Sequence, residues 1–203
     1  SLFTAETQRR AQERHARRAA EAGLNAALVF DAWDRTAKVS YDVAMLEELR
    51  TLRFVERHQH VLILGPVVVG KTMLTHALGH LAIARDFSVH CEPAAKMLQR
   101  LRASRMDGTH AIELRRLCTV DLLLLDHLAL QTMTNEEAAD LFDIVSGRHQ
   151  TASMVVSSNR DPSEWLALLP EPIQAQALVD RFANNAYDLV IEGESYRVRQ
   201  KPR

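Results

Sequence analysis

The chain has little that would indicate secretion, a membrane or a strongly charged partner. Its two cysteines, Cys91 and Cys118, follow neither a metal-ligand spacing nor a disulfide framework, which favours free thiols in a reducing compartment. No apolar run approaches the roughly 18 residues of a transmembrane helix, and no signal-peptide pattern opens the chain. The net charge of −1 gives no global attraction to nucleic acid or lipid. We therefore expect a cytoplasmic protein without a membrane partner, whose contacts depend on local surfaces.

A basic helix is predicted at the start of the chain. The segment from Thr4 to Ala22 consists largely of strong helix formers, and Gly23 is a typical helix stop. The chain enters this charged pattern directly and without a methionine, so we expect an upstream region to be missing. We interpret residues 1–24 as the end of that region and residues 25–203 as one main domain with a short basic tail.

Short apolar runs alternate with helix-period segments through the rest of the chain. The runs cover residues 61–64, 88–91, 120–125, 154–157 and 189–191. The helical segments cover residues 43–58, 71–85, 94–105, 136–149 and 164–182. Strands without polar alternation are typical of parallel sheets buried on both faces. The pattern predicts an α/β fold with a five-stranded parallel sheet between two helical layers.

A phosphate-binding loop follows the first of these strands. It reads Gly65-Pro66-Val67-Val68-Val69-Gly70-Lys71-Thr72 and matches G-x-x-x-x-G-K-[ST] between a strand and a helix. Backbone N–H groups of such a loop and the positive end of the helix cradle phosphates. Lys71 adds a cation and Thr72 an oxygen ligand for Mg²⁺. With Met73 next along the helix, these residues predict a site for ATP and Mg²⁺.

Two polar residues at strand ends are candidates for the rest of this site. Asp126 closes the run Leu122 to Leu125 and is suited to hold Mg²⁺ through water. Asn159 follows the apolar strand that begins at Met154, where an amide can orient the attacking water or contact the γ-phosphate. Each residue has a plainer alternative, since Asp126 is also suited to cap a helix or turn and Asn159 to close a turn.

Two longer stretches carry a family resemblance. Residues 157–165, Ser-Ser-Asn-Arg-Asp-Pro-Ser-Glu-Trp, and residues 191–197, Ile-Glu-Gly-Glu-Ser-Tyr-Arg, resemble the IstB-like family within the run 61–203. These AAA+ ATPases assist the transposases of bacterial insertion sequences and are similar to DnaC and DnaA. The resemblance implies a P-loop AAA+ fold, ATP-dependent homo-oligomers, DNA binding and a transposase partner. It also implies that Asn159 is the sensor-1 residue and Arg181 an arginine finger that reaches the ATP of a neighbouring subunit.

The family also places a DNA-facing helical insertion after the second strand. The corresponding segment is rich in cations: Lys96, Arg100, Arg102, Arg105, Arg115 and Arg116. Only Asp107 and Glu113 oppose them there. Such a cluster favours contacts with duplex phosphates that do not depend on base sequence. A solvated helix face is the alternative interpretation.

Two departures from the family pattern concern ATP turnover. Val67 and Val68 stand where Pro and Gly are expected, and β-branched side chains restrict the loop backbone. His127 replaces the second carboxylate that polarises the attacking water, although a neutral imidazole can still accept a proton. Besides the transposition helper, two alternatives stay open: a DnaC-like helicase loader, and a degenerate module that binds nucleotide without hydrolysing it.

Overall fold

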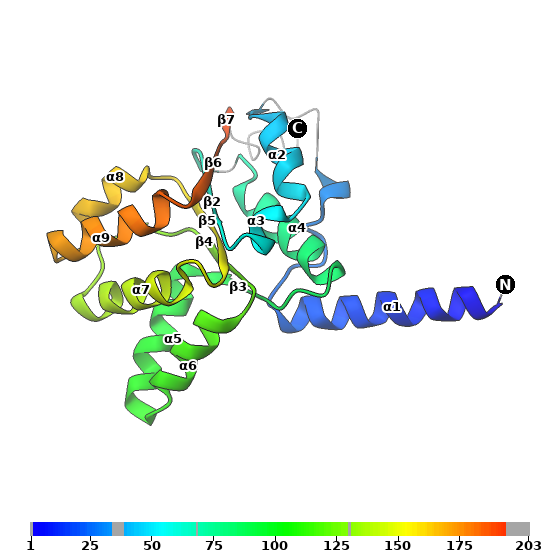
Figure 1. Ribbon diagram of the computed structural model, residues 1–203, viewed down its shortest axis with the longest axis horizontal. Helices are drawn as coiled ribbons and strands as arrows, with labels where there is room; N and C mark the ends of the chain where they lie inside the picture. Colours follow the sequence, from blue (N-terminus) through cyan, green and yellow to red (C-terminus); the bar gives the residue numbers. More distant parts are fainter. Residues whose placement is uncertain (1, 34–38, 68, 130, 194–203) are drawn as a thin grey trace, which may run out of the picture.

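The core of the structure is a parallel sheet of five strands. The computed structural model describes residues 2–33, 39–67, 69–129 and 131–193. Within them the strand order is β3-β4-β5-β2-β6, and each neighbouring pair runs parallel (Figure 1). The strands are β2 (His60–Leu64), β3 (Val89–Pro93), β4 (Leu122–Asp126), β5 (Ser153–Ser158) and β6 (Ala186–Val190). All five carboxyl ends therefore meet at one edge of the sheet.

Alternate residues of each strand face opposite sides of the sheet. In β4, Leu122 and Leu124 belong to one apolar cluster, whereas Leu123 and Leu125 belong to the other. All four are fully buried, because helices cover both faces. A strand buried on both sides has no room for polar alternation, which is why this segment is a run of leucines.

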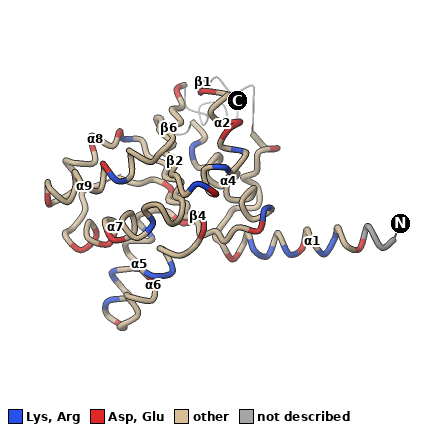
Figure 2. The backbone as a smooth tube through the Cα atoms, viewed as in Figure 1, with Lys and Arg blue, Asp and Glu red and all other residues tan. Residues whose placement is uncertain are grey.

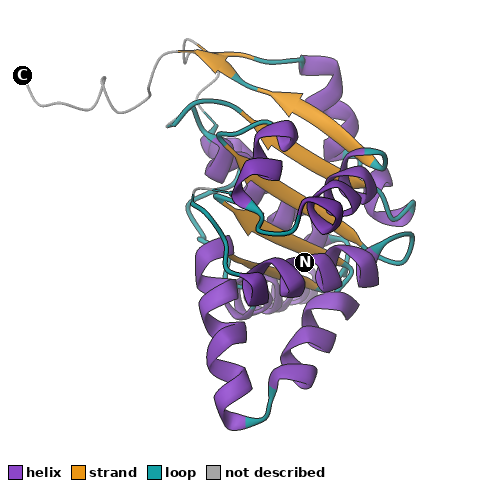
Figure 3. Ribbon diagram, turned by 90° about the vertical axis from the view of Figure 1, so that its left-hand side faces the viewer, coloured by secondary structure: helices purple, strands orange, loops and turns teal. Residues whose placement is uncertain are grey.

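Two helical layers enclose the sheet (Figure 3). The first includes α1 (Leu2–Glu21), α2 (Val43–Arg50), α3 (Arg53–Glu56) and α4 (Lys71–Ala84). The second includes α5 (Ala94–Asp107), α6 (His110–Thr119), α7 (Asn135–Arg148), α8 (Pro162–Trp165) and α9 (Pro172–Ala183). The predicted three-layer α/β/α fold is confirmed. No helix in the described part of the chain is long and apolar enough to span a membrane.

The first half of the N-terminal helix α1 projects away from the body, and the second half packs against it, where His15 stacks on His80 of α4 (Figure 1). Ala19 and Ala22 are buried there. Arg18 fastens the helix to the end of α4: its guanidinium donates to the Phe87 carbonyl at 2.9 Å and pairs with Asp86 at 2.7 Å. The basic helix is therefore present, and the domain boundary at residue 24 stays a prediction.

The prediction of one helix over residues 164–182 is wrong. The segment forms α8, a 3-10 turn η2 (Leu166–Leu168) and then α9. Pro170 and Pro172 separate η2 from α9, because proline lacks the N–H that a continuous helix needs at an interior position. Pro172 is tolerated as the first residue of α9.

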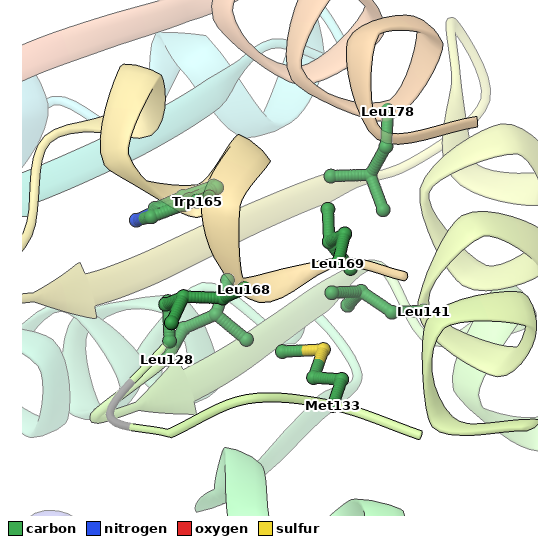
Figure 4. A pocket seen from close by; sticks show the side chains of 8 residues that line it. Leu128, Met133, Leu141, Trp165, Leu168, Leu169 and Leu178 are labelled. Carbon is green, nitrogen blue, oxygen red and sulfur yellow. The ribbon is translucent and has the colours of Figure 1, made fainter. Parts of the chain in front are cut away.

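Apolar packing docks this broken segment on the second layer. A small cavity of about 10 Å³ remains where η2 and α9 meet α7 and the loop after β4 (Figure 4). Trp165, Leu168, Leu141 and Met133 are among its lining side chains, all of which are apolar. A water molecule would find no polar side chain there, so apolar contacts hold the joint together with one backbone hydrogen bond, from the Met133 N–H to the Leu168 carbonyl at 2.9 Å.

The predicted helix over residues 43–58 is also interrupted. Leu52 adopts a left-handed backbone with φ of 59° and separates α2 from α3. Leu52 itself is fully buried, so packing outweighs the local cost of this conformation. Three short elements were not predicted: the 3-10 turn η1 (Phe30–Ala32) and the strands β1 (Val39–Ser40) and β7 (Glu192–Gly193), which pair antiparallel.

A buried histidine lies at the start of β2. His60 accepts a hydrogen bond at Nδ1 from the Met154 backbone N–H at 3.2 Å and stacks on Phe182 with a ring separation of 5.3 Å. Its Nε2 has no partner among the described residues. Burial, followed by the nearby charges of Arg148 and His149, lowers the pKa of His60 to about 4. The fold therefore holds this ring in its neutral form.

We expect acidification to destabilise the protein through His60. Its pKa is lower in the folded state than in the unfolded state, so the unfolded chain takes up the proton first as pH falls from 6.5 towards 4. The free energy of unfolding should fall by about 2 kcal/mol between pH 7 and pH 5 from this group alone. Urea titrations at both pH values measure it. His60→Gln should flatten the dependence, and the exposed control His58→Asn should not. An unchanged dependence in His60→Gln would contradict the assignment.

Candidate functional site

The phosphate loop lies between β2 and α4 and is closely packed at both glycines. A Cβ atom on Gly65 would lie 2.4 Å from the Ile191 carbonyl oxygen. Gly70 has φ of 100°, and a Cβ atom there would lie 2.6 Å from the Trp33 ring. Both positions therefore require glycine for space, and Gly70 also for its backbone angle. Val67 is exposed and Val69 buried, while Val68 lies outside the described residues.

Lys71 begins α4 and points back across the loop. Its ammonium group donates to the carbonyl oxygens of Gly65 at 2.8 Å and Pro66 at 2.6 Å. Burial lowers the pKa of Lys71, and the negative charge of Asp126 opposes that shift. The cation therefore lies inside the loop, where phosphate oxygens would compete with the two carbonyls for it.

Asp126 ends β4 and is the centre of a hydrogen-bonded cluster. Its side chain is buried. One oxygen, Oδ2, accepts from the Thr72 hydroxyl at 2.7 Å, and the other, Oδ1, accepts from the Ser157 hydroxyl. The cluster joins the ends of α4, β4 and β5, so the two predicted Mg²⁺ ligands lie together.

His127 follows Asp126 in a left-handed backbone conformation with φ of 59°. Its Nε2 lies 3.2 Å from Asp126 Oδ2, and its side chain is 49% exposed. Its backbone N–H donates to the Ser157 hydroxyl at 3.0 Å. The ring is thus turned towards the carboxylate and remains open to solvent, where a water or a phosphate can reach it.

Ser157 was missed as a site residue by sequence reasoning. It is fully buried and contacts both Asp126 and the backbone of His127. The available signal was a hydroxyl at the carboxyl end of an otherwise apolar strand. Asn159, two residues later, lies exposed just beyond β5, at the same edge of the sheet as Asp126.

Arg181 lies on the outer surface of α9. Its guanidinium donates to the Ser146 hydroxyl and stands over the Phe142 ring at 5.0 Å, and both partners are on α7. The residue is exposed. Among the described residues, no carboxylate lies within ion-pair distance of it, so its charge is not neutralised within the chain.

The six basic residues predicted to contact DNA lie on α5 and α6, which form a projecting hairpin (Figures 2 and 3). Two of them are half-buried and ion-paired, and the exposed Arg116 also lies 4.0 Å from Glu113. Arg100 pairs with Glu92 and Glu113, and Arg105 makes a two-pronged pair with buried Asp140 at 2.8 and 2.9 Å. The other four side chains are exposed: Lys96, Arg102, Arg115 and Arg116.

Oxygen ligands for Mg²⁺ are present, but the protein alone does not complete a metal site. Thr72 and Asp126 provide a hydroxyl and a carboxylate, which are donors that Mg²⁺ prefers. The described residues contain no group of three or more His, Cys, Asp or Glu side chains placed to hold a metal. The residues therefore fit an ion that takes its remaining ligands from phosphate and water.

Comparison with known families decides the relationship. Residues 1–203 match the family described as IstB-like ATP binding proteins. The chain belongs to this family. An ATP-binding protein predicted in an insertion sequence of Mycobacterium tuberculosis is 33% identical to this IstB-like chain over 187 residues, 92% of the chain and 74% of the relative. A corresponding protein of Geobacillus stearothermophilus is 31% identical over 84% of the chain and 68% of the relative.

Solved structures share the fold of this IstB-like protein. The replication initiator DnaA bound to AMPPCP and single-stranded DNA has a TM-score of 0.68 and 22% identity. The alignment covers 84% of the chain but only 51% of the DnaA chain, so the IstB-like chain corresponds to about half of DnaA. The DnaC helicase loader has a TM-score of 0.66 and 17% identity, with 81% of this chain and 96% of that chain covered. These likenesses confirm the P-loop AAA+ fold.

We expect MgATP to stabilise this IstB-like protein against heat and Lys71→Ala to remove the effect. At a nucleotide concentration about 100-fold above Kd, the melting temperature should rise by about 5 to 10 °C. Lys71→Ala should reduce the rise to near zero, because the loop loses its phosphate-binding cation. The exposed Lys96→Ala is the matched control and should keep the full shift. Thermal melts with and without MgATP measure it, and an undiminished shift in Lys71→Ala would refute the assigned site.

Proposed function

We propose that the protein is an ATP-dependent, DNA-binding helper of transposition that assembles with ATP and recruits the transposase of its element. The supporting observation is the contact of Thr72 with Asp126 beside the phosphate loop, in a chain of the IstB-like family. Its relatives at 31 to 33% identity are named for insertion sequences. A cytoplasmic location and the lack of a membrane partner stay predictions.

The nucleotide is proposed to bind along the loop, with Mg²⁺ beside Thr72 and Asp126. A bound Mg²⁺ would neutralise phosphate charge. Lys71 would release its two loop carbonyls and bind phosphate oxygens instead. Ser157 would keep Asp126 in place, since it holds the carboxylate oxygen that does not contact Thr72.

Assembly is proposed to proceed through Arg181. Among the described residues, the partners of this guanidinium are the Ser146 hydroxyl and the Phe142 ring. It can therefore turn away from them without breaking an ion pair. The γ-phosphate of a neighbouring subunit would offer it a much stronger, charge-assisted contact. ATP bound by one copy would thereby favour docking of the next, with Asn159 as the sensor beside its own nucleotide.

The α5–α6 hairpin is proposed as the DNA-binding surface. Its four exposed cations are Lys96, Arg102, Arg115 and Arg116, and they can reach phosphates without breaking an internal pair, except that Arg116 lies 4.0 Å from Glu113. Arg100 and Arg105 act differently, as braces that hold the hairpin to the body through Glu92 and Asp140.

A second candidate function is nucleotide binding without turnover, and His127 is the observation that favours it. The imidazole lies where the family has a carboxylate, 3.2 Å from Asp126. If it accepts a proton from water, the site hydrolyses ATP slowly. If it does not, ATP serves only to hold subunits together.

We expect the wild type to hydrolyse ATP slowly and His127→Asp to raise the rate about tenfold or more. The aspartate would bring the negative charge that polarises the attacking water, which a neutral imidazole lacks. Phosphate release is measured with Mg²⁺, with and without duplex DNA. His127→Asn, similar in size but unable to accept the proton, is the control and should not gain. Lys71→Ala gives the background. A wild-type rate equal to that background would leave the non-hydrolysing function as the better account.

Neutralising the exposed hairpin cations should weaken DNA binding and its salt dependence. The double variant Arg102→Gln/Arg115→Gln should reduce the slope of log K against log salt by about 2, since each lost phosphate contact removes about 0.9. Fluorescence anisotropy at several salt concentrations measures this slope. Arg57→Gln, an exposed arginine on another part of the surface, is the control. Equal slopes in the wild type and the double variant would exclude the hairpin as the DNA-binding surface.

A further inference from the structure

Two large apolar side chains stand in solvent at the tip of the α5–α6 hairpin. Met106 is 90% exposed and Ile112 is 69% exposed. They flank the turn that joins the two helices, at the end of the hairpin that projects furthest from the sheet (Figure 3). A single exposed apolar residue is ordinary on a protein surface. Whether this pair is a binding surface therefore depends on the residues around it.

The turn between the two residues is rigidly built. Gly108 ends α5 with φ of 77°. Asp107 accepts from the backbone N–H of Thr109 at 3.0 Å and from its hydroxyl at 2.6 Å. A side chain displayed on a fixed turn loses little freedom on binding, which favours its use as a contact.

The same end of the hairpin is clamped to α7. Arg105, one residue before Met106, and His110, two residues before Ile112, both contact Asp140, at 2.8 and 2.9 Å. Asp140 is buried. Both helices are therefore anchored to one carboxylate close to the apolar pair, and a force on the tip is carried into the body of the protein.

Exposed cations lie one turn behind each apolar residue. Arg102 precedes Met106 by four residues on α5, and Arg115 follows Ile112 by three on α6, which are spacings of neighbours on a helix surface. Neither arginine makes an ion pair among the described residues. The nearby acids are already engaged, since Asp107 holds the turn and Glu113 binds Arg100. An apolar tip with a cation behind each side chain is complementary to duplex DNA, which has an anionic backbone on the outside and stacked, largely apolar bases inside.

We propose that Met106 and Ile112 form an apolar wedge that enters between stacked base pairs of the duplex held by the hairpin. The inference rests on the proposed function, because the arginines must first bind the backbone. Apolar side chains make no hydrogen bonds with base edges, so the wedge reads how easily a base step opens and not its sequence. Pyrimidine–purine steps and mismatches unstack most easily and are the preferred sites.

The test separates binding from distortion. Wild-type protein with ATP and Mg²⁺ is titrated onto duplexes that carry one 2-aminopurine, whose fluorescence rises when it unstacks, and onto a matched duplex with one mismatch. We expect fluorescence to rise at saturation and the mismatched duplex to bind about tenfold more tightly. Met106→Ala/Ile112→Ala should lose both effects and keep the salt slope of the wild type. Ile173→Ala, 89% exposed on α9, is the matched control and should keep both effects.

Three results would overturn the wedge. The first is saturated binding by the wild type without any rise in fluorescence. The second is a rise that persists undiminished in Met106→Ala/Ile112→Ala. The third is loss of self-association in that double variant without DNA, measured by sedimentation, which would make the tip a protein interface. If the proposed function itself is wrong, the result differs from all three, because the wild type would then bind no duplex at any salt concentration. The wedge would be excluded together with it.

Discussion

The carboxylate of Asp126 is a buried negative charge at the end of a fully apolar strand, and the nucleotide site is arranged around the groups that stabilise it. A buried charge is tolerated only where hydrogen bonds and opposite charges compensate its lost hydration. Thr72 and Ser157 each hold one of its oxygens, and Lys71, the first residue of α4, provides a nearby cation. Thr72 and Lys71 belong to α4, Ser157 to β5 and the carboxylate itself to β4, so this one group fixes how the three elements meet.

Sequence reasoning found the parts of this site that follow from a local pattern. The phosphate loop, Asp126 and the parallel sheet each have a signature within a few residues, because strand burial and loop geometry are short-range requirements. Ser157 has no such signature. Its role arises from the pairing of β5 with β4, which brings residues about 30 positions apart into contact. The break before α9 was visible in Pro170 and Pro172 and was outweighed by the helical period around them.

Charge clustering is a weaker guide than motif spacing, and the hairpin shows why. All six basic residues look alike in the sequence, but Arg100 and Arg105 lie opposite acids contributed by β3 and α7. Only the tertiary fold brings those acids near. The sequence of α5 alone therefore does not distinguish an arginine that pairs with an acid of the body from one that is free to contact DNA. Arg105 and His110 both contact Asp140, so both helices of the hairpin are attached to α7. Arg181 also contacts α7, through Ser146.

The attachment of α1 has a mechanical consequence. The helix α4 starts at the phosphate loop with Lys71 and ends about 20 Å away, where Arg18 ties the root of α1 to the turn that follows. Beyond His15, which stacks on His80 of α4, the helix α1 extends outward as an arm about 20 Å long. If α4 tilted by roughly 10° on phosphate binding, the far end of such an arm would move by about 3 Å. A small movement at the phosphate loop would thus become a larger displacement at the N-terminal end of α1.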